Sequence, residues 1–445
     1  MTVKQDAGRV YGRIEPTVHN VDSLAQFSCT APVQSSMASL PMPYVGHLGL
    51  EKQMRTVALL FVLLVGSTQA IAQNVSNDPK NSTITADMQT VLPHIGGRVV
   101  TEALPKSLPV GAMSYRHEWP GVYFEADFTG DTIFAKFDDP ANEYRVLIDD
   151  LPPITIAQPG ASEVTIGGIS NANHHIRLEK VTESAWIVGA FDGFYLPKGE
   201  KGTGAAPRQR QIEFIGDSDM TGYGVRSSGH VCTQDEVRLL SDTQIAYPAL
   251  LAKALNADYQ VNAISGRGLI RNFGGGTDHA LPSVYANSLP DLGPGIDLPP
   301  YQNTLWKPDL IVVALGGNDF STPLVAGEDW QTNDQLIDDF IVEYTRFLTT
   351  LHDGNPDAAL LLVQFEIGML AGDDLTRIAE FQQTALPEIA RAIGFRSANT
   401  VSIFAMATDA TACHYHASQA DHQRRADWLT AYVAGQPALW QGNGG

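Results

Sequence analysis

Short runs in which apolar and polar residues alternate characterise the chain from about residue 97 to residue 200. Within each run the apolar residues recur about every second position, and Gly, Pro, Asp or Asn separates the runs, which is typical of strands joined by turns. The runs cover residues 121–128, 132–137, 144–149, 162–167, 174–180 and 185–196. No segment with helical periodicity interrupts them. The pattern therefore predicts a β-sandwich domain over residues 97–200.

A different pattern begins after residues 197–210, a stretch of Gly, Pro and basic residues that we interpret as the domain boundary. Apolar runs typical of buried strands now alternate with segments whose apolar residues recur every three to four positions. The predicted strands cover 212–216, 259–264, 309–316 and 358–365, and the predicted helices cover 245–255, 333–352, 374–393 and 419–434. This alternation predicts a three-layer α/β domain over residues 211–435, with helices on both faces of a parallel sheet.

The one long apolar run, VALLFVLLV at residues 57–65, is too short to cross a bilayer, which takes about 20 residues. Met54 and Arg55 precede this run, and Ala70-Ile71-Ala72 follows it. A cation, an apolar stretch and a small-x-small cleavage site in this order are typical of a signal peptide. The alternative, a buried strand, lacks a hydrophobic partner segment.

Because signal peptides stand at the N-terminus, we expect translation to begin at Met54, with residues 1–53 an upstream misassignment and unstructured. Residues 54–72 are then the signal peptide, and the polar residues 73–96 form a flexible leader. The sequence thus predicts a secreted or periplasmic protein.

Composition changes this picture only by excluding classes of partner. The 445 residues favour two or three domains, and 44% hydrophobic with 18% charged residues is an ordinary globular balance. Lys and Arg number 29 against 49 Asp and Glu, which gives a net charge of −20. Nucleic acids and anionic membranes recruit basic surfaces, so neither is an expected partner. A neutral ligand such as a sugar chain fits better, and the oligomeric state stays open.

Three polar motifs follow successive predicted strands. Gly216-Asp217-Ser218 follows the first strand, Ser265-Gly266 the second, and Gly316-Gly317-Asn318-Asp319 the third. Ser218 on a tight turn would expose its hydroxyl, Gly266 lets a backbone N–H approach a ligand, and the Asn318 amide can donate to an oxyanion. Each motif alone is equally an ordinary turn.

A cluster of histidines stands late in the chain, just before the last predicted helix: His414 and His416, with His422 close behind. A serine hydroxyl becomes a good nucleophile when a neighbouring base removes its proton, and histidine has a suitable pKa. Metal binding is the weaker alternative, because only Cys413 accompanies these histidines at ligand spacing.

The order of the four motifs resembles the four conserved blocks of the SGNH (GDS-type) hydrolase superfamily. The resemblance covers residues 211–435. It implies that Ser218 is the nucleophile and His416 the base. It also implies an oxyanion hole built from the Ser218 and Gly266 amides and the Asn318 side chain, and a reaction that needs neither a cofactor nor a metal.

A narrower resemblance is to carbohydrate esterase family 2. It is carried by a β-sandwich ahead of the SGNH domain and by the late segment Cys413-His414-Tyr415-His416, and it covers about residues 97–435. The family implies a jelly-roll N-terminal domain and an acetyl esterase that acts on acetylated plant cell-wall polysaccharide, chiefly xylan. An acetylated polysaccharide or oligosaccharide is therefore the expected partner.

The histidine segment departs from the usual SGNH pattern. Cys413 stands where an Asp is usual, three residues before His416, and Ala417 replaces the usual proline. The group that orients the histidine is therefore open. A backbone carbonyl would give a Ser–His dyad, which some members of the family use, and Asp409 is the nearest preceding carboxylate.

The resemblance has further consequences for a cysteine pair and two aromatic residues. If the domain folds as implied, the loops that carry Cys232 and Cys413 lie at the same end of the sheet, and in an exported protein these residues are expected to form a disulfide.

Aromatic rings at sugar sites commonly stack on the substrate. Tyr415 and Trp330 are therefore candidate substrate-binding residues, and packing is the alternative for each.

Two other functions compete with acetyl-ester hydrolysis of polysaccharides. One is a broad-specificity short-chain lipolytic or aryl esterase with the same catalytic groups, which the acidic chain and the lack of a large apolar lid segment disfavour. The other is a non-catalytic glycan-binding protein with a relic hydrolase domain, which the four intact motifs disfavour.

Overall fold

The computed structural model describes residues 72–76, 82–184, 187–290, 300–363, 385, 387–389, 391, 401–403 and 408–440. Residues 1–53, the expected signal peptide apart from Ala72, and most of the helix predicted over 374–393 lie outside the described residues. The described residues belong to the unit Ser67–Gly445 and build an antiparallel and a parallel sheet.

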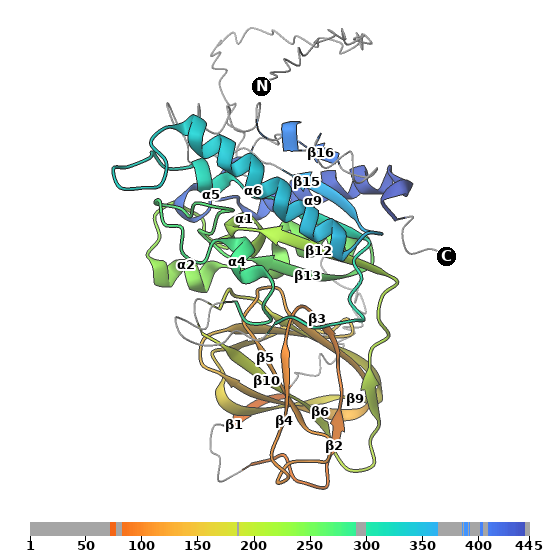
Figure 1. The fold of residues 1–445 in the computed structure, drawn as a ribbon. Coiled ribbons are helices and arrows are strands. Elements are labelled where there is room, and N and C mark those ends of the chain that lie inside the picture. The colour runs from red at the N-terminus through yellow and green to blue at the C-terminus, as the bar shows by residue number, and fades with distance from the viewer. Residues whose placement is uncertain are drawn as a thin grey trace, which may run out of the picture. The chain divides into compact units, whose positions relative to one another are not determined.

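The alternating runs form an antiparallel sheet of eleven strands, with the order β4-β5-β10-β6-β9-β7-β8 along its main path (Figure 1). Its longest strands, β6 and β9, pair from Tyr123 opposite Glu179 to Asp139 opposite Gly160. The strands are β1 (Ala72–Ser76), β2 (Gln89–Val91), β3 (His94–Gly96), β4 (Val100–Ala103), β5 (Met113–His117), β6 (Tyr123–Asp139), β7 (Glu143–Ile148), β8 (Ile154–Ala157), β9 (Gly160–Lys180), β10 (Gly189–Leu196) and β11 (Gly202–Gly204).

The apolar residues of the alternating runs point into one core of this β domain. Phe191 lies at its centre, fully buried, with ring centroids 4.7 Å from Phe124, 5.5 Å from Phe137 and 4.7 Å from Phe194. Truncating a phenylalanine packed in this way typically costs about 3–5 kcal/mol. The period-two pattern thus predicted the β domain correctly, while its jelly-roll connectivity stays a prediction.

The β domain is longer than predicted at both ends. Strands β2 and β3 lie within 73–96, the expected flexible leader, and pair with β10 and β6. Strand β11 continues the sheet beyond residue 200 by pairing with β6. These strands have three residues each, which is too short for an alternating pattern to stand out in the sequence.

The second sheet is parallel, with the order β13-β12-β14-β15-β16. Its strands are β12 (Arg210–Gly216), β13 (Ala257–Ala263), β14 (Leu310–Val313), β15 (Ala359–Val363) and β16 (Val401–Ile403). The segments around them are α1 (Ser218–Thr221), α2 (Gln234–Leu240), η2 (Thr243–Ile245), α3 (Tyr247–Ala254), α4 (Leu281–Tyr285), α5 (Gly317–Phe320), α6 (Asn333–Gly354), η4 (Cys413–Tyr415), α9 (Gln419–Ala434) and η5 (Pro437–Trp440).

Neighbouring residues of each central strand enter different cores, because side chains of a strand alternate between its faces. Ile215 of β12 packs in the same core as Phe340 of α6, whereas Phe214 packs with Leu251 of α3 and Leu429 of α9. Helices therefore cover both faces of the sheet, which gives the three-layer α/β domain predicted from the sequence.

Buried polar contacts join the β domain to the α/β domain. Arg98 forms an ion pair with Glu213 of β12 at 2.9 Å, and both side chains are buried. Tyr123 of β6 donates a hydrogen bond to Asp258 of β13 at 2.7 Å. Removing one partner of a buried ion pair typically costs about 3–5 kcal/mol, so these contacts hold the two sheets in one arrangement.

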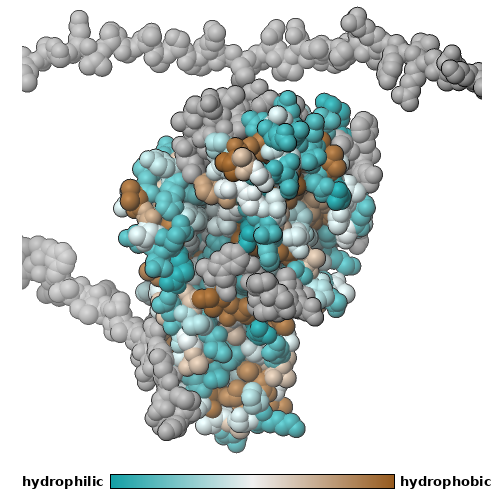
Figure 2. All heavy atoms as spheres, turned by 60° about the vertical axis from the view of Figure 1, so that its left-hand side comes forward, coloured by the Kyte–Doolittle hydropathy of each residue, from teal (hydrophilic) through white to brown (hydrophobic). Residues whose placement is uncertain are grey.

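Figure 2 shows teal and white side chains over most of the coloured face in view, with scattered brown ones between them. Val110, Val231 and Leu305 are among the most exposed large apolar residues. Among the described residues, no helix combines the length and the apolar character that a membrane span requires.

Candidate active site

The four sequence motifs meet at one edge of the parallel sheet. Ser218 follows β12, Gly266 follows β13 and Asn318 follows β14, and these three strands are neighbours. The carboxyl ends of adjacent parallel strands share an edge, so loops far apart in sequence converge there. Together with His416 they line a cavity of about 700 Å³.

Ser218 and His416 are in direct contact. Ser218 Oγ lies 2.9 Å from His416 Nε2, and His416 Nδ1 lies 3.0 Å from the carbonyl oxygen of Cys413. A carbonyl only accepts hydrogen bonds, so Nδ1 carries the proton and Nε2 is left to accept from the serine. The sequence left the orienting group open, and in the structure the backbone carbonyl occupies this place. Asp409 instead pairs with Arg424 at 3.0 Å.

The surroundings of His416 favour its neutral form. Burial lowers its pKa below the usual 6.5, and the nearby carboxylate of Asp219 opposes this shift. Asp219 is itself held by an ion pair with Arg425 at 3.0 Å. A neutral imidazole can take a proton from the serine hydroxyl, which is the state that a general base requires.

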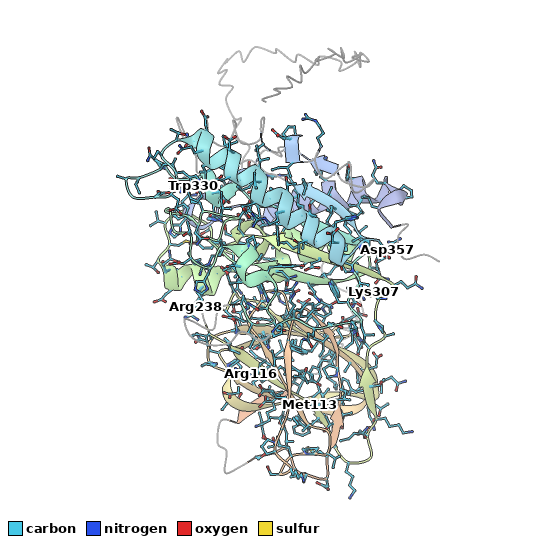
Figure 3. All side chains as sticks on the ribbon, viewed as in Figure 1. Met113, Arg116, Arg238, Lys307, Trp330 and Asp357 are labelled. Atoms are coloured by element: carbon cyan, nitrogen blue, oxygen red, sulfur yellow. A yellow bond between two sulfur atoms is a disulfide. The ribbon has the colours of Figure 1, made fainter. Side chains whose placement is uncertain are left out.

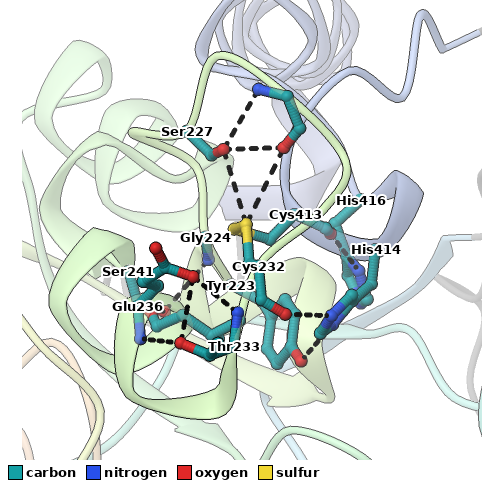
Figure 4. The surroundings of a disulfide bond; sticks show 12 residues. Tyr223, Gly224, Ser227, Cys232, Thr233, Glu236, Ser241, Cys413, His414 and His416 are labelled. Atoms are coloured by element: carbon teal, nitrogen blue, oxygen red, sulfur yellow. Dashed lines mark hydrogen bonds between the residues drawn. A yellow bond between two sulfur atoms is a disulfide. The ribbon is translucent and has the colours of Figure 1, made fainter.

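The loop before His416 is fixed by unusual backbone geometry and by side chains. His414 and Tyr415 both have left-handed backbone angles, with φ of 52° and 62°. The Tyr223 hydroxyl donates to His414 Nδ1 at 2.9 Å, and His414 Nε2 donates to the carbonyl of Cys232 at 2.8 Å (Figure 4). The Tyr223 ring also packs against His416, with centroids 4.2 Å apart.

A disulfide joins Cys232 to Cys413, with Cα atoms 5.5 Å apart, in the pairing inferred from the sequence (Figure 4). Each cysteine also presents its carbonyl oxygen to a histidine, Cys232 to His414 and Cys413 to His416. The disulfide therefore ties the loop after Ser218 to the loop that orients the imidazole.

Asn318 has its amide group at the cavity, but the group is already engaged. Asn318 Nδ2 donates to Asp217 Oδ2 at 3.1 Å and to the carbonyl of Arg267 at 2.8 Å. Burial, with the nearby Asp219 charge, raises the pKa of Asp217 to about 8. An amide nitrogen has two hydrogens, so donation to a reacting oxygen would share or replace one of these bonds.

Gly266 and the rest of its loop are held from two sides. Gly266 has φ of 78°, a conformation that favours glycine, and a Cβ at this position would meet no atom within 4 Å. Ser265, just before it, bonds to Glu183 of the β domain through its backbone N–H and its hydroxyl. On the other side, Asp319 accepts hydrogen bonds from the backbone N–H groups of Leu269, Ile270 and Arg271.

Comparison with known proteins agrees with this arrangement. Family models described as Carbohydrate esterase 2 N-terminal and GDSL-like Lipase/Acylhydrolase family match residues 110–205 and 214–432. An acetylxylan esterase / glucomannan deacetylase of Cellvibrio japonicus is 37% identical over 366 residues, which are 81% of this chain and 96% of that protein. The chain belongs to carbohydrate esterase family 2. This family 2 esterase is a carboxylic ester hydrolase with an SGNH hydrolase fold.

Solved structures show the same likeness. A carbohydrate esterase whose active site displays divergent catalytic and non-catalytic binding functions is 36% identical, with a TM-score of 0.69, over 79% of this chain and 100% of that one. A family 2 carbohydrate esterase from Clostridium thermocellum, in complex with cellohexaose, is 25% identical, with a TM-score of 0.62, over 78% of this chain and 100% of that one. The family 2 fold thus spans both domains of the esterase.

The two aromatic candidates have different surroundings. Trp330 is only 8% exposed, packs in the core beside α6 and donates its indole N–H to Asp339 at 2.9 Å (Figure 3). Its prediction as a substrate-binding residue was wrong, because a loop position in the sequence does not reveal burial. Tyr415 is 50% exposed, lines the cavity and stacks on His230, with ring centroids 4.1 Å apart.

Several residues of the site were missed from the sequence, above all Tyr223, Glu183 and Asp219. Asp219 directly follows Ser218, so its closeness could have been noticed. Tyr223 and Glu183 lie outside the four motifs and reach the site only through tertiary packing. No local pattern in the sequence marks them.

One cluster of the family 2 esterase has the composition of a metal site. Ligand atoms of His94, Glu125 and Asp258 lie within 4.8 Å of one another among the described residues. Arg208 forms ion pairs with both carboxylates, at 2.8 and 2.9 Å. A protein cation already neutralises these groups, so the cluster is an ion-pair network between the domains.

Proposed function

We propose that the chain is an exported serine esterase that removes O-acetyl groups from acetylated plant cell-wall polysaccharide such as xylan. In this proposal Ser218 is the nucleophile, His416 is the general base and acid, and the Cys413 carbonyl orients the imidazole. The observation that carries it is the 2.9 Å contact between Ser218 Oγ and His416 Nε2. The second contact of the imidazole, from His416 Nδ1 to the Cys413 carbonyl at 3.0 Å, supports the same proposal.

In the first half-reaction, Ser218 Oγ attacks the acetyl carbonyl carbon while His416 Nε2 accepts the hydroxyl proton. The tetrahedral intermediate then collapses, Nε2 donates the proton to the sugar oxygen, and the deacetylated sugar leaves. In the second half, His416 takes a proton from water, which attacks the acetyl-serine, and acetate leaves as Ser218 regains its proton. The lowered pKa of His416 keeps the imidazole ready to accept a proton at neutral pH.

The oxyanion of each intermediate is stabilised by the backbone N–H groups of Ser218 and Gly266 and by the Asn318 amide. The hydrogen of Asn318 that is directed at Asp217 turns to the oxyanion as negative charge develops. Asp217 loses less in this exchange than an ordinary carboxylate would, because burial raises its pKa and favours its neutral form. One such donor typically contributes about 2.7–4 kcal/mol of transition-state stabilisation.

The substrate class is supported by relatives and by the rim of the cavity. The Cellvibrio japonicus relative is named an acetylxylan esterase / glucomannan deacetylase, and the Clostridium thermocellum structure holds cellohexaose. Tyr415, half exposed and stacked on His230, offers a flat ring on which a sugar can pack. The net charge of −20 suits an uncharged glycan better than an anionic lipid surface.

Acetate release from acetylated xylan and glucomannan, with Ser218→Ala as the matched control, tests this function. We expect the native chain to release acetate and Ser218→Ala to release none above background. Chain-length profiling with 4-nitrophenyl acetate, butyrate and octanoate separates the alternative, because a deacetylase loses activity beyond short acyl groups. Full activity of Ser218→Ala would reject the assignment, and a preference for octanoate would favour a lipolytic enzyme.

The proposal also covers export and the N-terminal segments. The disulfide between Cys232 and Cys413 supports an oxidising compartment, since such bonds are rare in the cytosol. We expect the mature protein to begin near Gln73 after cleavage behind Ala72, and translation to begin at Met54. N-terminal sequencing of the exported protein tests the cleavage site, and N-terminal peptides of the unprocessed precursor test the start at Met54. A chain that retains residues 1–53 would overturn both expectations.

A further inference from the structure

One side chain of the β domain reaches the catalytic edge of the α/β domain. Glu183 lies in the loop between β9 and β10, and its carboxylate accepts two hydrogen bonds from Ser265. The Ser265 backbone N–H is 2.9 Å from Oε1, and the Ser265 hydroxyl is 2.6 Å from Oε2. Both donors belong to the residue that immediately precedes Gly266.

The loop that carries Glu183 is itself anchored. The fully buried Lys180 donates to the carbonyls of Glu118 and Trp119 at 2.9 and 3.1 Å, and to the Ser184 hydroxyl at 2.6 Å. The α/β domain also contacts this loop, because the backbone N–H of Thr243 donates a hydrogen bond to the carbonyl of Val181 at 2.9 Å. These hydrogen bonds fix the position of the loop, and with it the position of the Glu183 carboxylate.

Polar contacts continue from Ser265 to the turn that carries Ser218. The Ser265 hydroxyl, whose proton goes to Glu183, lies 3.0 Å from Thr221 Oγ1. The single proton of the Thr221 hydroxyl can go to Ser265 Oγ or to the carbonyl of Ser218, which is 3.2 Å away. Glu183 thus stands at one end of a chain of contacts whose other end is Ser218. Gly266, with its left-handed backbone, has no side chain of its own to hold it.

We propose that Glu183 is a positioning residue that holds the Ser265–Gly266 turn, so that the Gly266 N–H is aligned with the Ser218 N–H for the oxyanion. This inference rests on the proposed function, and it gives the β domain a part in turnover besides any part in binding glycans. A misplacement of about 1 Å at a reacting centre can cost roughly a hundredfold in rate. Loss of Glu183 should therefore lower kcat with little change in KM.

Glu163 provides a matched control within the same domain. Its carboxylate also accepts a serine hydroxyl and a backbone N–H, from Ser82 and Thr83, both at 2.8 Å. Those partners belong to the β domain and line no part of the active-site cavity. Glu163 also accepts from the Thr83 hydroxyl, the Ile84 N–H and Lys136, so Glu163→Ala removes at least as many carboxylate contacts as Glu183→Ala, without touching the turn before Gly266.

The experiment compares kcat and KM on 4-nitrophenyl acetate, together with the thermal midpoint, for Glu183→Ala, Glu183→Gln, Ser265→Ala and Glu163→Ala. We expect kcat of Glu183→Ala to fall roughly 10- to 100-fold with KM within about threefold of the native value. Glu183→Gln keeps the volume and one acceptor oxygen, so it should retain more activity. Glu163→Ala should keep native kcat even where it lowers the midpoint.

Coupling between the two partners gives an independent readout. The double variant Glu183→Gln/Ser265→Ala should be little worse than the poorer single variant, because both changes break the same contact. Native kcat in Glu183→Ala and Glu183→Gln, a loss matched by Glu163→Ala, or an effect on KM alone would each overturn the proposal. Turnover by Ser218→Ala would instead reject the proposed function, so the two failures are distinguishable.

Discussion

Breaking the Cys232–Cys413 disulfide should weaken both the stability and the turnover of the esterase. The bond closes a loop with a sequence separation of 181 residues. It also lies at the catalytic end of the sheet, where the Cys413 carbonyl binds His416 Nδ1 at 3.0 Å. The change is made by the double variant Cys232→Ser/Cys413→Ser, and independently by reduction of the native protein.

The expected loss of stability follows from the length of the loop. The chain-entropy model assigns about 5 kcal/mol at 25 °C to a loop of this length, while native disulfides typically contribute about 2–4 kcal/mol. We therefore expect the free energy of unfolding to fall by roughly 2–5 kcal/mol. The serine pair keeps nearly the native volume, so little of this loss should come from packing.

The effect on turnover should be smaller, because other contacts still hold the histidine loop. The His414 ring keeps its hydrogen bonds to Tyr223 and to the Cys232 carbonyl, at 2.9 and 2.8 Å. We expect kcat to fall about tenfold, which corresponds to about 1.4 kcal/mol of transition-state free energy. KM should change little, because the disulfide acts on the orientation of the base.

Denaturant unfolding and steady-state kinetics on 4-nitrophenyl acetate measure the two effects, with mass spectrometry to confirm the redox state. A single Cys232→Ser variant is the control for the substitution itself, and its kinetics should match those of the reduced native protein. Native stability together with native kcat in the fully reduced protein would refute the reasoning that the bond holds the histidine loop in place.

Three further predictions concern individual groups of the site. Asn318→Ala should lower kcat on 4-nitrophenyl acetate roughly 100- to 1000-fold, the usual loss of one oxyanion donor, and a change below threefold would contradict its role. Trp330→Ala should destabilise the protein by about 3–5 kcal/mol without raising KM for acetylated xylan, whereas Tyr415→Ala should raise that KM and leave the thermal midpoint nearly unchanged. Because the pKa of His416 is lowered and its neutral form is the active one, kcat/KM should fall as pH drops through a midpoint below 6.5, and a midpoint above 7 would contradict this.

The sequence predicted which residues come together where strand ends determine position, while their catalytic roles stay predictions. Ser218, Gly266 and Asn318 lie within five residues of the ends of β12, β13 and β14, and adjacent parallel strands bring such positions to one edge whatever the intervening loops do. The period-two and longer periodic patterns likewise located both domains. These features depend on local sequence and on the general geometry of parallel sheets.

Features that depend on packing could not be predicted in this way. Trp330 is a core residue because α6 covers it, and Glu183 reaches the site because two domains meet there. The choice between a carboxylate and a carbonyl as orienting group was open for the same reason, since φ values of 52° and 62° at His414 and Tyr415 bring the Cys413 carbonyl under the imidazole. Nothing in the residue types themselves indicates these angles.

The use of the Cys413 carbonyl has a consequence for how this dyad can vary. A main-chain oxygen does not ionise, so in the proposed mechanism the imidazolium of His416 gains no full counter-charge from its orienting partner. No substitution of a side chain deletes that oxygen either; only a change in the path of the backbone moves it. In the proposed dyad, the backbone path of a short loop therefore sets the orientation of the imidazole, and no third side chain is needed for it.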